Sequence, residues 1–292
     1  MHSNVLTWQD TFDAFTARKR HAAETARLPG YTTLVVNATG QAGLEPIASA
    51  WTAALFDGPF FESPSPDPAL PAVNTVFVQS ADGNTGTRNP ASLGGGATDT
   101  HLIYEGLSRV RADAVLTGAT TIHGSQMVFS VWHPELVRLR DEAGLPRHPA
   151  QIVATINGRL GIASELLFNV PDVPVFILTT AAGAAAVKSQ ADARPWITVL
   201  VSEPDAHLVD ALKALRADHG IRRISCIGGR TLATELIDAG LVQDLYLTTS
   251  PVPGGEPGTP FYTGTGLPHT TSIVRKAGRA EETGVVFEHL TI

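Results

Sequence analysis

The chain has 292 residues with a formal net charge of −7, and 43% of its residues are hydrophobic. This is an ordinary globular composition with enough apolar residues for a sizeable core. The acidic balance without basic clusters argues against a nucleic-acid or anionic-membrane partner, and a single cysteine excludes intramolecular disulfides and multi-cysteine zinc sites. The N-terminus lacks a signal-peptide pattern, and no apolar run approaches the ~20 residues that span a bilayer. We therefore expect a cytoplasmic protein.

The first part of the chain is expected to form an arm. It contains a charged helical segment at about 8–27, a β-rich run "YTTLVV" and an apolar run "IASAWTAALF". These are too few for a core of their own. The stretch "ESPSPDPALPA", residues 62–72, holds four prolines and predicts a semi-rigid linker. We expect residues 1–72 to pack on the main domain or on a second subunit, and residues 73–292 to form that main domain.

Beyond the linker, short apolar strands alternate with amphipathic helices. The pattern predicts strands at 75–79, 113–118, 151–155, 173–180, 196–201, 221–227 and 244–250. It predicts helices at 98–110, 205–218 and 231–239, the first of them capped by Thr98 or Asp99. Such alternation indicates a three-layer α/β/α fold with a mainly parallel sheet. Two final β-rich runs, 270–276 and 284–291, have no helix between them and are expected to pair antiparallel at an edge.

A pair of glycines, Gly228 and Gly229, stands where a strand is expected to end and a helix to begin. In a doubly wound sheet, ligands bind outside the carboxyl ends of the strands, where helix N-termini offer N–H groups to phosphate. Arg230 and Thr231 add further donors. A tight turn without a ligand is the alternative, since the chain has neither a G-x-G-x-x-G nor a G-x-x-x-x-G-K-[ST] motif.

Three other strand ends are polar. "LTGATTIHG", residues 116–124, is a hydroxyl-rich turn, and Thr179-Thr180 precedes an alanine-rich helix. Together with the glycine pair they indicate one cleft for an elongated ligand. In "QSADGNTG", residues 79–86, Asp82-Gly83 is a strong turn signal. The turn either has no other role or holds the Asp82 carboxyl over the cleft.

Together these segments resemble the C-terminal reductase domain of the bacterial riboflavin-biosynthesis deaminase–reductase, whose fold is dihydrofolate-reductase-like. "SADGNTG" is similar to the S-x-D-G element of that family and "ADAVLTGATT" to its A-D-A-x-L-x-G-x-x-T element. "GGRTLATELIDAGLVQDLYLTTSP" is similar to its G-G-x-x-L…L-V-D-E-L element. The similarity covers about residues 73–292. It departs from the family at His123-Gly124, where an acidic residue is usual, and at Gln243-Asp244, and the arm lacks the H-x-E and P-C-x-x-C patterns of the zinc deaminase half.

The resemblance implies an NADPH-dependent reductase, working as a homodimer on a small-molecule substrate. The family transfers hydride to C1′ of 5-amino-6-(5-phosphoribosylamino)uracil, which opens the ribose to a ribityl chain. The resemblance and the strand ends together give the cofactor-binding residues Thr117, Gly118, Ala119, Thr120, Thr155, Arg159, Thr179, Gly228, Gly229, Arg230, Thr231 and Leu232. The substrate-binding residues are Ser80, Asp82, Gly83 and Arg88.

Among these residues, Asp82 is expected to be catalytic, orienting or protonating the substrate. Arg88 is assigned to the substrate phosphate and Arg159 to the extra phosphate of the cofactor, because arginine suits bidentate phosphate contact. A solvated surface position is the alternative for both arginines.

Two other functions stay open. The departures from the family leave room for a diverged reductase of another heterocycle, such as a pterin. A non-catalytic NADPH-binding protein would keep the fold without turnover. No metal is expected, because none of the ten histidines forms a recognised ligand spacing.

Overall fold

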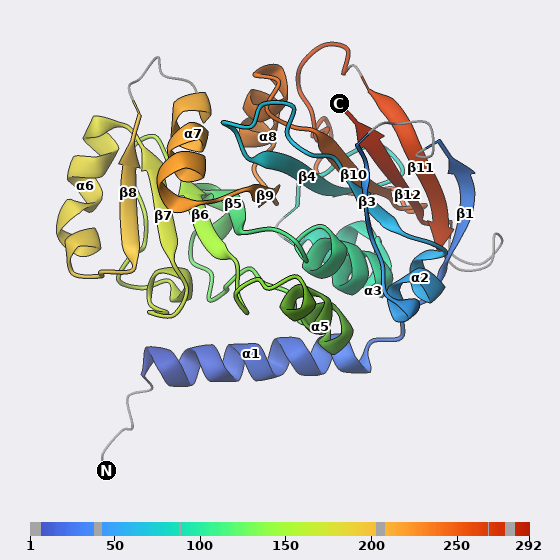
Figure 1. Cartoon of the computed structure of the whole chain (residues 1–292), viewed down its shortest axis with the longest axis horizontal. Helices are drawn as coiled ribbons and strands as arrows, with labels where there is room; N and C mark the ends of the chain where they lie inside the picture. The colour runs from blue at the N-terminus through green and yellow to red at the C-terminus, as the bar shows by residue number, and fades with distance from the viewer. Residues whose placement is uncertain (1–6, 38–42, 88, 203–207, 268, 278–283) are drawn as a thin grey trace.

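The computed structural model describes residues 7–37, 43–87, 89–202, 208–267, 269–277 and 284–292, so Arg88 lies outside the described residues. Within them, one ten-stranded sheet has the order β1-β11-β12-β10-β4-β9-β5-β6-β7-β8 (Figure 1). Its parallel strands are β4 (Ala72–Gln79), β5 (Ala114–Gly118), β6 (Ala150–Ala154), β7 (Val175–Thr179), β8 (Ile197–Val201), β9 (Arg223–Cys226) and β10 (Asp244–Thr249). The antiparallel strands are β1 (Tyr31–Val36), β11 (Thr270–Ala277) and β12 (Val286–Thr291).

Helices cover both faces of the sheet and confirm the three-layer α/β/α fold. One hydrophobic cluster joins the first face to the π-helix η3 (Asp99–Leu107), α5 (Pro134–Glu142) and α6 (Ala181–Asp192). A second cluster joins the other face to α7 (Leu208–His219) and α8 (Arg230–Asp238). The remaining short helices are α3 (Gly96–Thr98), α4 (Ala119–Ile122), η2 (Pro90–Leu93) and η4 (Leu166–Phe168).

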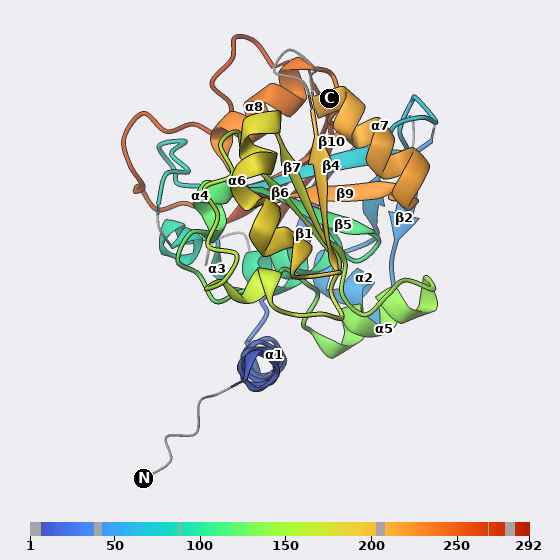
Figure 2. The same ribbon diagram turned by 90° about the vertical axis from the view of Figure 1, so that its left-hand side faces the viewer.

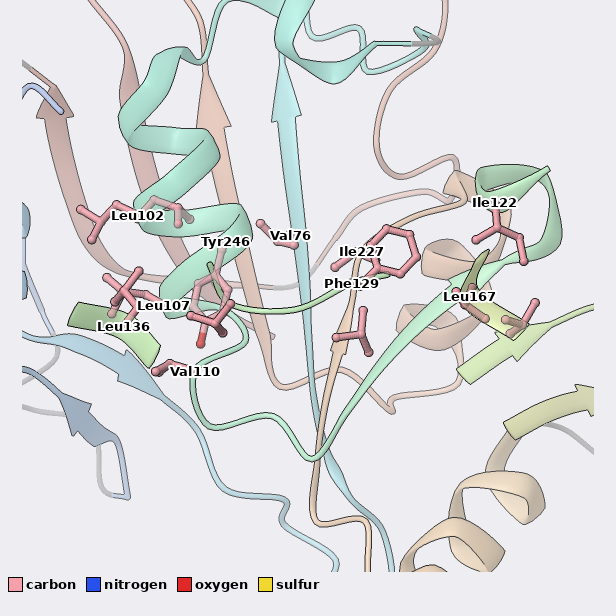
Figure 3. Close-up of a cluster of buried hydrophobic side chains, with 14 of the residues drawn as sticks. Val76, Leu102, Leu107, Val110, Ile122, Phe129, Leu136, Leu167, Ile227 and Tyr246 are labelled. Atoms are coloured by element: carbon pink, nitrogen blue, oxygen red, sulfur yellow. The ribbon is translucent and has the colours of Figure 1, made fainter. Parts of the chain in front are cut away.

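The first cluster lies directly beneath the strand ends that matter for function. Figure 3 shows Leu102 and Leu107 of η3 beside Tyr246 of β10 on one side of Val76 of β4, with Phe129 and Ile227 on its other side. Ile122 of α4 and Ile227, which follows β9, belong to the same buried cluster. The turns after β5 and β9 are therefore anchored by core side chains.

The segment expected as a capped α-helix at 98–110 differs in detail. Its apolar face is buried as expected, but it is a short α-turn that widens into the π-helix η3, with non-helical backbone at Gly106. The expectation that Thr98 or Asp99 caps it is wrong, because the segment begins earlier, at Gly96. The Thr98 hydroxyl instead donates to the Pro29 carbonyl at 2.8 Å, and Asp99 is buried.

The first 62 residues contact the sheet at several places. The two C-terminal strands, β11 and β12, pair antiparallel as expected. β1 pairs with the other side of β11 and forms the outer edge of the sheet. α2 (Ala50–Phe56) and the hairpin of β2 (Glu45–Ile47) and β3 (Phe60–Glu62) follow β1. α1 (Trp8–Thr25) lies along the bottom of the molecule, seen end-on in Figure 2, and buries Phe12 and Phe15 in one cluster with Trp132. None of the helices in the described ranges is long and apolar enough to cross a membrane.

Candidate functional site

The predicted site residues that lie in the described part of the chain stand at or near one edge of the sheet. Strands β10, β4, β9, β5, β6 and β7 are consecutive, parallel neighbours, so their carboxyl ends share that edge. Asp82 follows β4, and the glycine pair follows β9. Thr117-Gly118 ends β5, and Thr155 and Thr179 stand at the ends of β6 and β7. This is the edge at which open α/β sheets bind their ligands.

The centre of the site lies between β5 and β9. The Ile227 amide donates to the Leu116 carbonyl at 3.0 Å, which holds the two strand ends together. A Cβ atom at Gly228 would lie 3.1 Å from Thr121 Oγ1 and 3.8 Å from Thr117 Oγ1. Thr117 is only 1% exposed, and its hydroxyl has no hydrogen-bond partner in the described part of the chain. Leaving a buried hydroxyl unpaired costs about 1–3 kcal/mol, which makes Thr117 a candidate partner for a ligand.

Two helices start at this centre without a side-chain cap. The N-cap residues are Gly118 for α4 and Gly229 for α8, and neither helix has a side-chain cap hydrogen bond. Gly229 has φ +83°, a conformation that favours glycine. By contrast, the Thr180 hydroxyl caps α6 by accepting from the Gly183 amide at 3.2 Å. The first-turn N–H groups of α8 therefore remain available to an anion.

The residues that open α8 differ in what they offer. Arg230 is half-buried and Thr231 is exposed, so both side chains reach the surface beside Gly229. Leu232 packs into the second core cluster, which leaves only its backbone for a ligand.

The turn after β6 is rigid and exposed at its tip. The Thr155 amide donates to the Leu178 carbonyl at 3.0 Å, and the Ile156 carbonyl accepts from the Thr180 hydroxyl at 2.8 Å. Gly158, at φ +67°, packs so closely that an added Cβ would lie 2.3 Å from the Gly183 carbonyl oxygen. Ile156 is 78% exposed and Arg159 is also exposed.

Thr179 lies below this turn. It is buried, and its hydroxyl faces the Ile156 carbonyl at 3.5 Å, so it supports the turn from beneath. Its role as a cofactor-binding residue stays a prediction.

The predicted substrate side is a tight turn after β4. The Gly83 amide donates to the Ser80 carbonyl at 2.9 Å, and Gly83 has φ +76°. Ser80 is fully buried, and its hydroxyl oxygen accepts from the Asn84 amide at 3.3 Å. The Asp82 side chain is exposed at the tip of the turn. The Ala81 amide donates to the Val252 carbonyl at 3.0 Å, which ties this turn to the loop after β10.

Asp99 is a candidate functional residue that the sequence analysis treated only as a helix cap. It is 6% exposed, and a Cβ at Gly95 would lie 2.9 Å from both Asp99 Oδ2 and Val78 Cγ2, which places the carboxyl near the end of β4. Burial raises the pKa of Asp99 to about 6, an effect that the Thr248 hydroxyl partly opposes. Thr248 is the register partner of Val78, so this acid lies at the ends of β4 and β10.

A signal for Asp99 is present in the sequence. Asp99 precedes Leu102, Ile103 and Gly106 by three, four and seven positions, a spacing that places an acid on the apolar face. Strongly shifted carboxyls in such places are candidates for proton transfer.

Glu165 is a second acid that the sequence analysis missed. It is 3% exposed, and its Oε1 accepts from the Gly124 amide at 3.0 Å and lies 4.0 Å from His123 Nδ1. Burial raises the pKa of this carboxyl. A carboxylate from the loop after β6 thus reaches the place where the family usually has an acidic residue after its threonine. Across the described ranges, no three His, Cys, Asp or Glu side chains are grouped to hold a metal ion.

Strand order and layers define a dihydrofolate-reductase-like α/β fold, the fold of the pyrimidine reductases. The sequence places the chain within that class. A family model for the RibD C-terminal domain matches residues 71–284, and the chain belongs to this family.

Solved structures share the fold at low sequence identity. RibD of Acinetobacter baumannii superposes with a TM-score of 0.60 at 17% identity, covering 76% of this chain and 58% of that one. A pyrimidine reductase-like protein of Corynebacterium diphtheriae gives 0.60 at 19% identity, covering 76% and 92%. The riboflavin biosynthesis reductase Rib7 of Saccharomyces cerevisiae gives 0.55 at 14%, covering 78% and 93%. The chain therefore spans little more than half of the Acinetobacter RibD. No curated protein matches the sequence.

Proposed function

We propose that this protein is an NADPH-dependent reductase that transfers hydride to C1′ of 5-amino-6-(5-phosphoribosylamino)uracil or a close relative. Membership of the RibD C-terminal domain family and the fold of the reductases named above support this proposal. The observation that carries it is the centre of the site. There, a buried, unpartnered Thr117 hydroxyl lies beside the side-chain-free Gly228 and an uncapped helix N-terminus.

These residues suit a phosphorylated nicotinamide cofactor. Amides at the start of α8 and the Thr117 and Thr121 hydroxyls supply neutral donors for a diphosphate, and Gly228 lets the phosphate approach the backbone. Thr155 and Arg159 are proposed to extend the site to the extra phosphate of the cofactor. Both follow β6, which is two strands away from β9 and the Gly228 turn, and Arg159 lies on the rigid turn there. When bound, NADPH supplies the hydride, and the protein holds the two reactants in line.

Two carboxyls are proposed to handle the substrate. Opening of the ribose breaks the C1′–O4′ bond, moves the N–H proton to O4′ and leaves a C1′–nitrogen double bond. Reduction of this double bond then delivers hydride to C1′ and requires a proton at nitrogen. Asp99, with a pKa of about 6, is protonated in a fraction of the molecules near neutral pH. We propose that it donates the proton that the nitrogen requires. Asp82, exposed on the turn after β4, is proposed to orient the substrate through a hydrogen bond.

The decisive experiment titrates the purified protein with NADPH and NADH, and then follows NADPH oxidation at 340 nm with the uracil intermediate. Saturable oxidation with the intermediate supports the proposal. Oxidation with dihydrofolate alone would move the substrate to the pterins. Tight NADPH binding without oxidation by either compound would leave a binding protein. The homodimer is part of the same proposal, and light scattering of the purified protein tests it.

A further inference from the structure

A second cluster of charged side chains lies at the opposite, amino-terminal edge of the sheet. Arg223 begins β9 and Asp244 begins β10, and both meet Glu62 and Ser63 where β3 leads into the linker. The strand ends that form the candidate active site are at the other end of these strands. The cluster is therefore separate from that site and needs its own explanation.

Asp244 is well satisfied in this cluster. Its Oδ2 accepts from the Ser63 amide at 2.7 Å, and its Oδ1 accepts from the Ser63 hydroxyl at 2.7 Å. His289 Nε2 lies 2.7 Å from the same Oδ1. These contacts hold the end of β3 on the sheet.

Glu62 is buried with much weaker compensation. Its side chain is 4% exposed, and its Oε2 lies 3.3 Å from Arg223 Nη1. The same guanidinium makes a shorter contact, 2.7 Å, with Glu45 Oε2, whose side chain is 45% exposed and which also lies 3.5 Å from Arg111 Nη1. One arginine is thus shared by two carboxyls, and the buried carboxyl has the longer contact. A buried charge with incomplete pairing is costly.

The groups that surround Glu62 come from every neighbouring element. Arg223 of β9 and Arg111 before β5 favour its charged form, whereas Asp244 of β10 and Glu45 of β2 disfavour it. Tyr246 of β10 donates to the Phe61 carbonyl at 2.9 Å and lies near the same carboxyl. Burial is the largest influence, and it raises the pKa of Glu62 from its ordinary 4.5 to about 8.

The seam between this hairpin and the sheet also contains open space. A cavity of about 10 Å³, enough for one water molecule, is lined by Glu62, Asn74, Arg223 and Asp244. A surface pocket of about 240 Å³ is lined by Ile47 and Ala48 together with Val110 and the end of α5. The hairpin therefore rests on the main body in two ways: Ile47 and Phe60 are buried in the first core cluster, whereas the Glu62 end is held by polar contacts beside open space.

From this geometry we propose that the β2–β3 hairpin is a proton-dependent clasp, seated on the amino-terminal edge while Glu62 is protonated and loosened when Glu62 ionises. Ionisation adds a buried negative charge beside Asp244 and Glu45, and the two arginines that favour this charge, Arg223 and Arg111, both also contact Glu45. Separation of the hairpin lets water reach Glu62. Because the folded-state pKa of Glu62, about 8, lies above its ordinary value of 4.5, the stabilisation is complete below pH 4.5, is lost as pH rises from there to about 8, and changes no further above that.

The test is amide hydrogen exchange of the full chain between pH 6.5 and 9.5, with rates corrected for the intrinsic pH dependence. We expect protection of residues 45–62 to fall by roughly tenfold or more from pH 7 to 9, while protection of β5–β7 stays constant. Glu62→Gln keeps a neutral side chain and should hold the hairpin protected throughout. Glu165→Gln, at a buried carboxyl on another part of the molecule, is the matched control and should retain the wild-type fall.

Two outcomes would overturn the clasp. The first is a wild-type profile that is flat, or that changes equally in the hairpin and in β5–β7; this result needs no variant and so does not depend on whether Glu62→Gln folds. The second is a Glu62→Gln protein whose hairpin protection falls with pH as in the wild type.

Discussion

Replacing Gly228 by alanine tests the cofactor site with little disturbance of the fold. Gly228 is not among the residues with positive φ, so alanine introduces no backbone strain there. The added Cβ would lie 3.1 Å from Thr121 Oγ1, a contact that a shift of a few tenths of an ångström relieves. The methyl group would occupy the space between the Gly228 backbone and the Thr117 and Thr121 hydroxyls. A phosphate could then no longer approach these groups together.

The expected loss follows from the hydrogen bonds that the methyl group displaces. A hydrogen bond to a charged group contributes about 1.5–3 kcal/mol, and each 1.4 kcal/mol is a factor of ten in affinity. Losing one such bond should raise the Kd for NADPH by roughly 10- to 100-fold. Isothermal titration calorimetry measures the Kd, and thermal unfolding of the same sample shows that the variant is folded.

Gly240→Ala is the matched control at the other end of α8. Gly240 has φ +67° with open space around it, so alanine there costs strain of about 1–2 kcal/mol without touching the site. This variant should unfold at a lower temperature and bind NADPH with wild-type affinity. A Gly228→Ala protein with wild-type Kd, or a Gly240→Ala protein with an equally weakened Kd, would refute the placement of the phosphates at this turn.

Three further variants test the other assignments. Asp99→Asn should lower kcat/KM by about 10²–10⁴ and remove the wild-type loss of activity above a pH of about 6, because only the protonated acid donates; a pH–rate profile that keeps this limb would contradict the role. The same variant should unfold at a higher temperature at pH 8, since the folded-state pKa exceeds the unfolded 3.8 and ionised Asp99 destabilises the fold above pH 6. Asp82→Asn should lower kcat at least about tenfold with little change in the Kd for NADPH, and an unchanged kcat would remove Asp82 from the reaction. Arg159→Ala should raise the Kd for NADPH about tenfold and leave that for NADH unchanged, so equal effects on both cofactors would exclude a contact with the extra phosphate.

Most of the sheet and the edge that carries the site were predictable from local patterns. Central strands such as β5 and β7 are short apolar runs buried on both faces, and Leu212 and Leu215 mark the buried face of α7, which ends before Gly220 at φ +68°. Parallel strands place their carboxyl ends together. The sequence alone was therefore enough to predict that the polar residues after these strands lie at one edge.

What could not be predicted depends on contacts between distant segments. The outer position of β1 follows from its pairing with β11, more than 200 residues away. The widening into a π-helix at Asp99 was not predicted, because the sequence indicated a regular helix with a cap, although the spacing of Asp99 does place it on the buried face. Glu165 reaches Gly124 across 41 positions. The contacts of β1 and Glu165 leave no periodic signal in the sequence, because they depend on how distant segments pack after the strands have assembled.

The two departures from the family pattern have separate physical explanations, and neither changes the proposed cofactor site. The carboxylate of Asp244, in the element that reads Gln243-Asp244 here, binds Ser63 and His289 at the amino-terminal edge. Gln243 Oε1 meanwhile accepts from the Val73 amide at 2.8 Å and continues the backbone bonding of β4. At the other departure, Glu165 supplies a carboxylate beside His123-Gly124. We therefore expect any difference in substrate to arise in the turn after β4, which the Ala81 amide ties to the loop after β10.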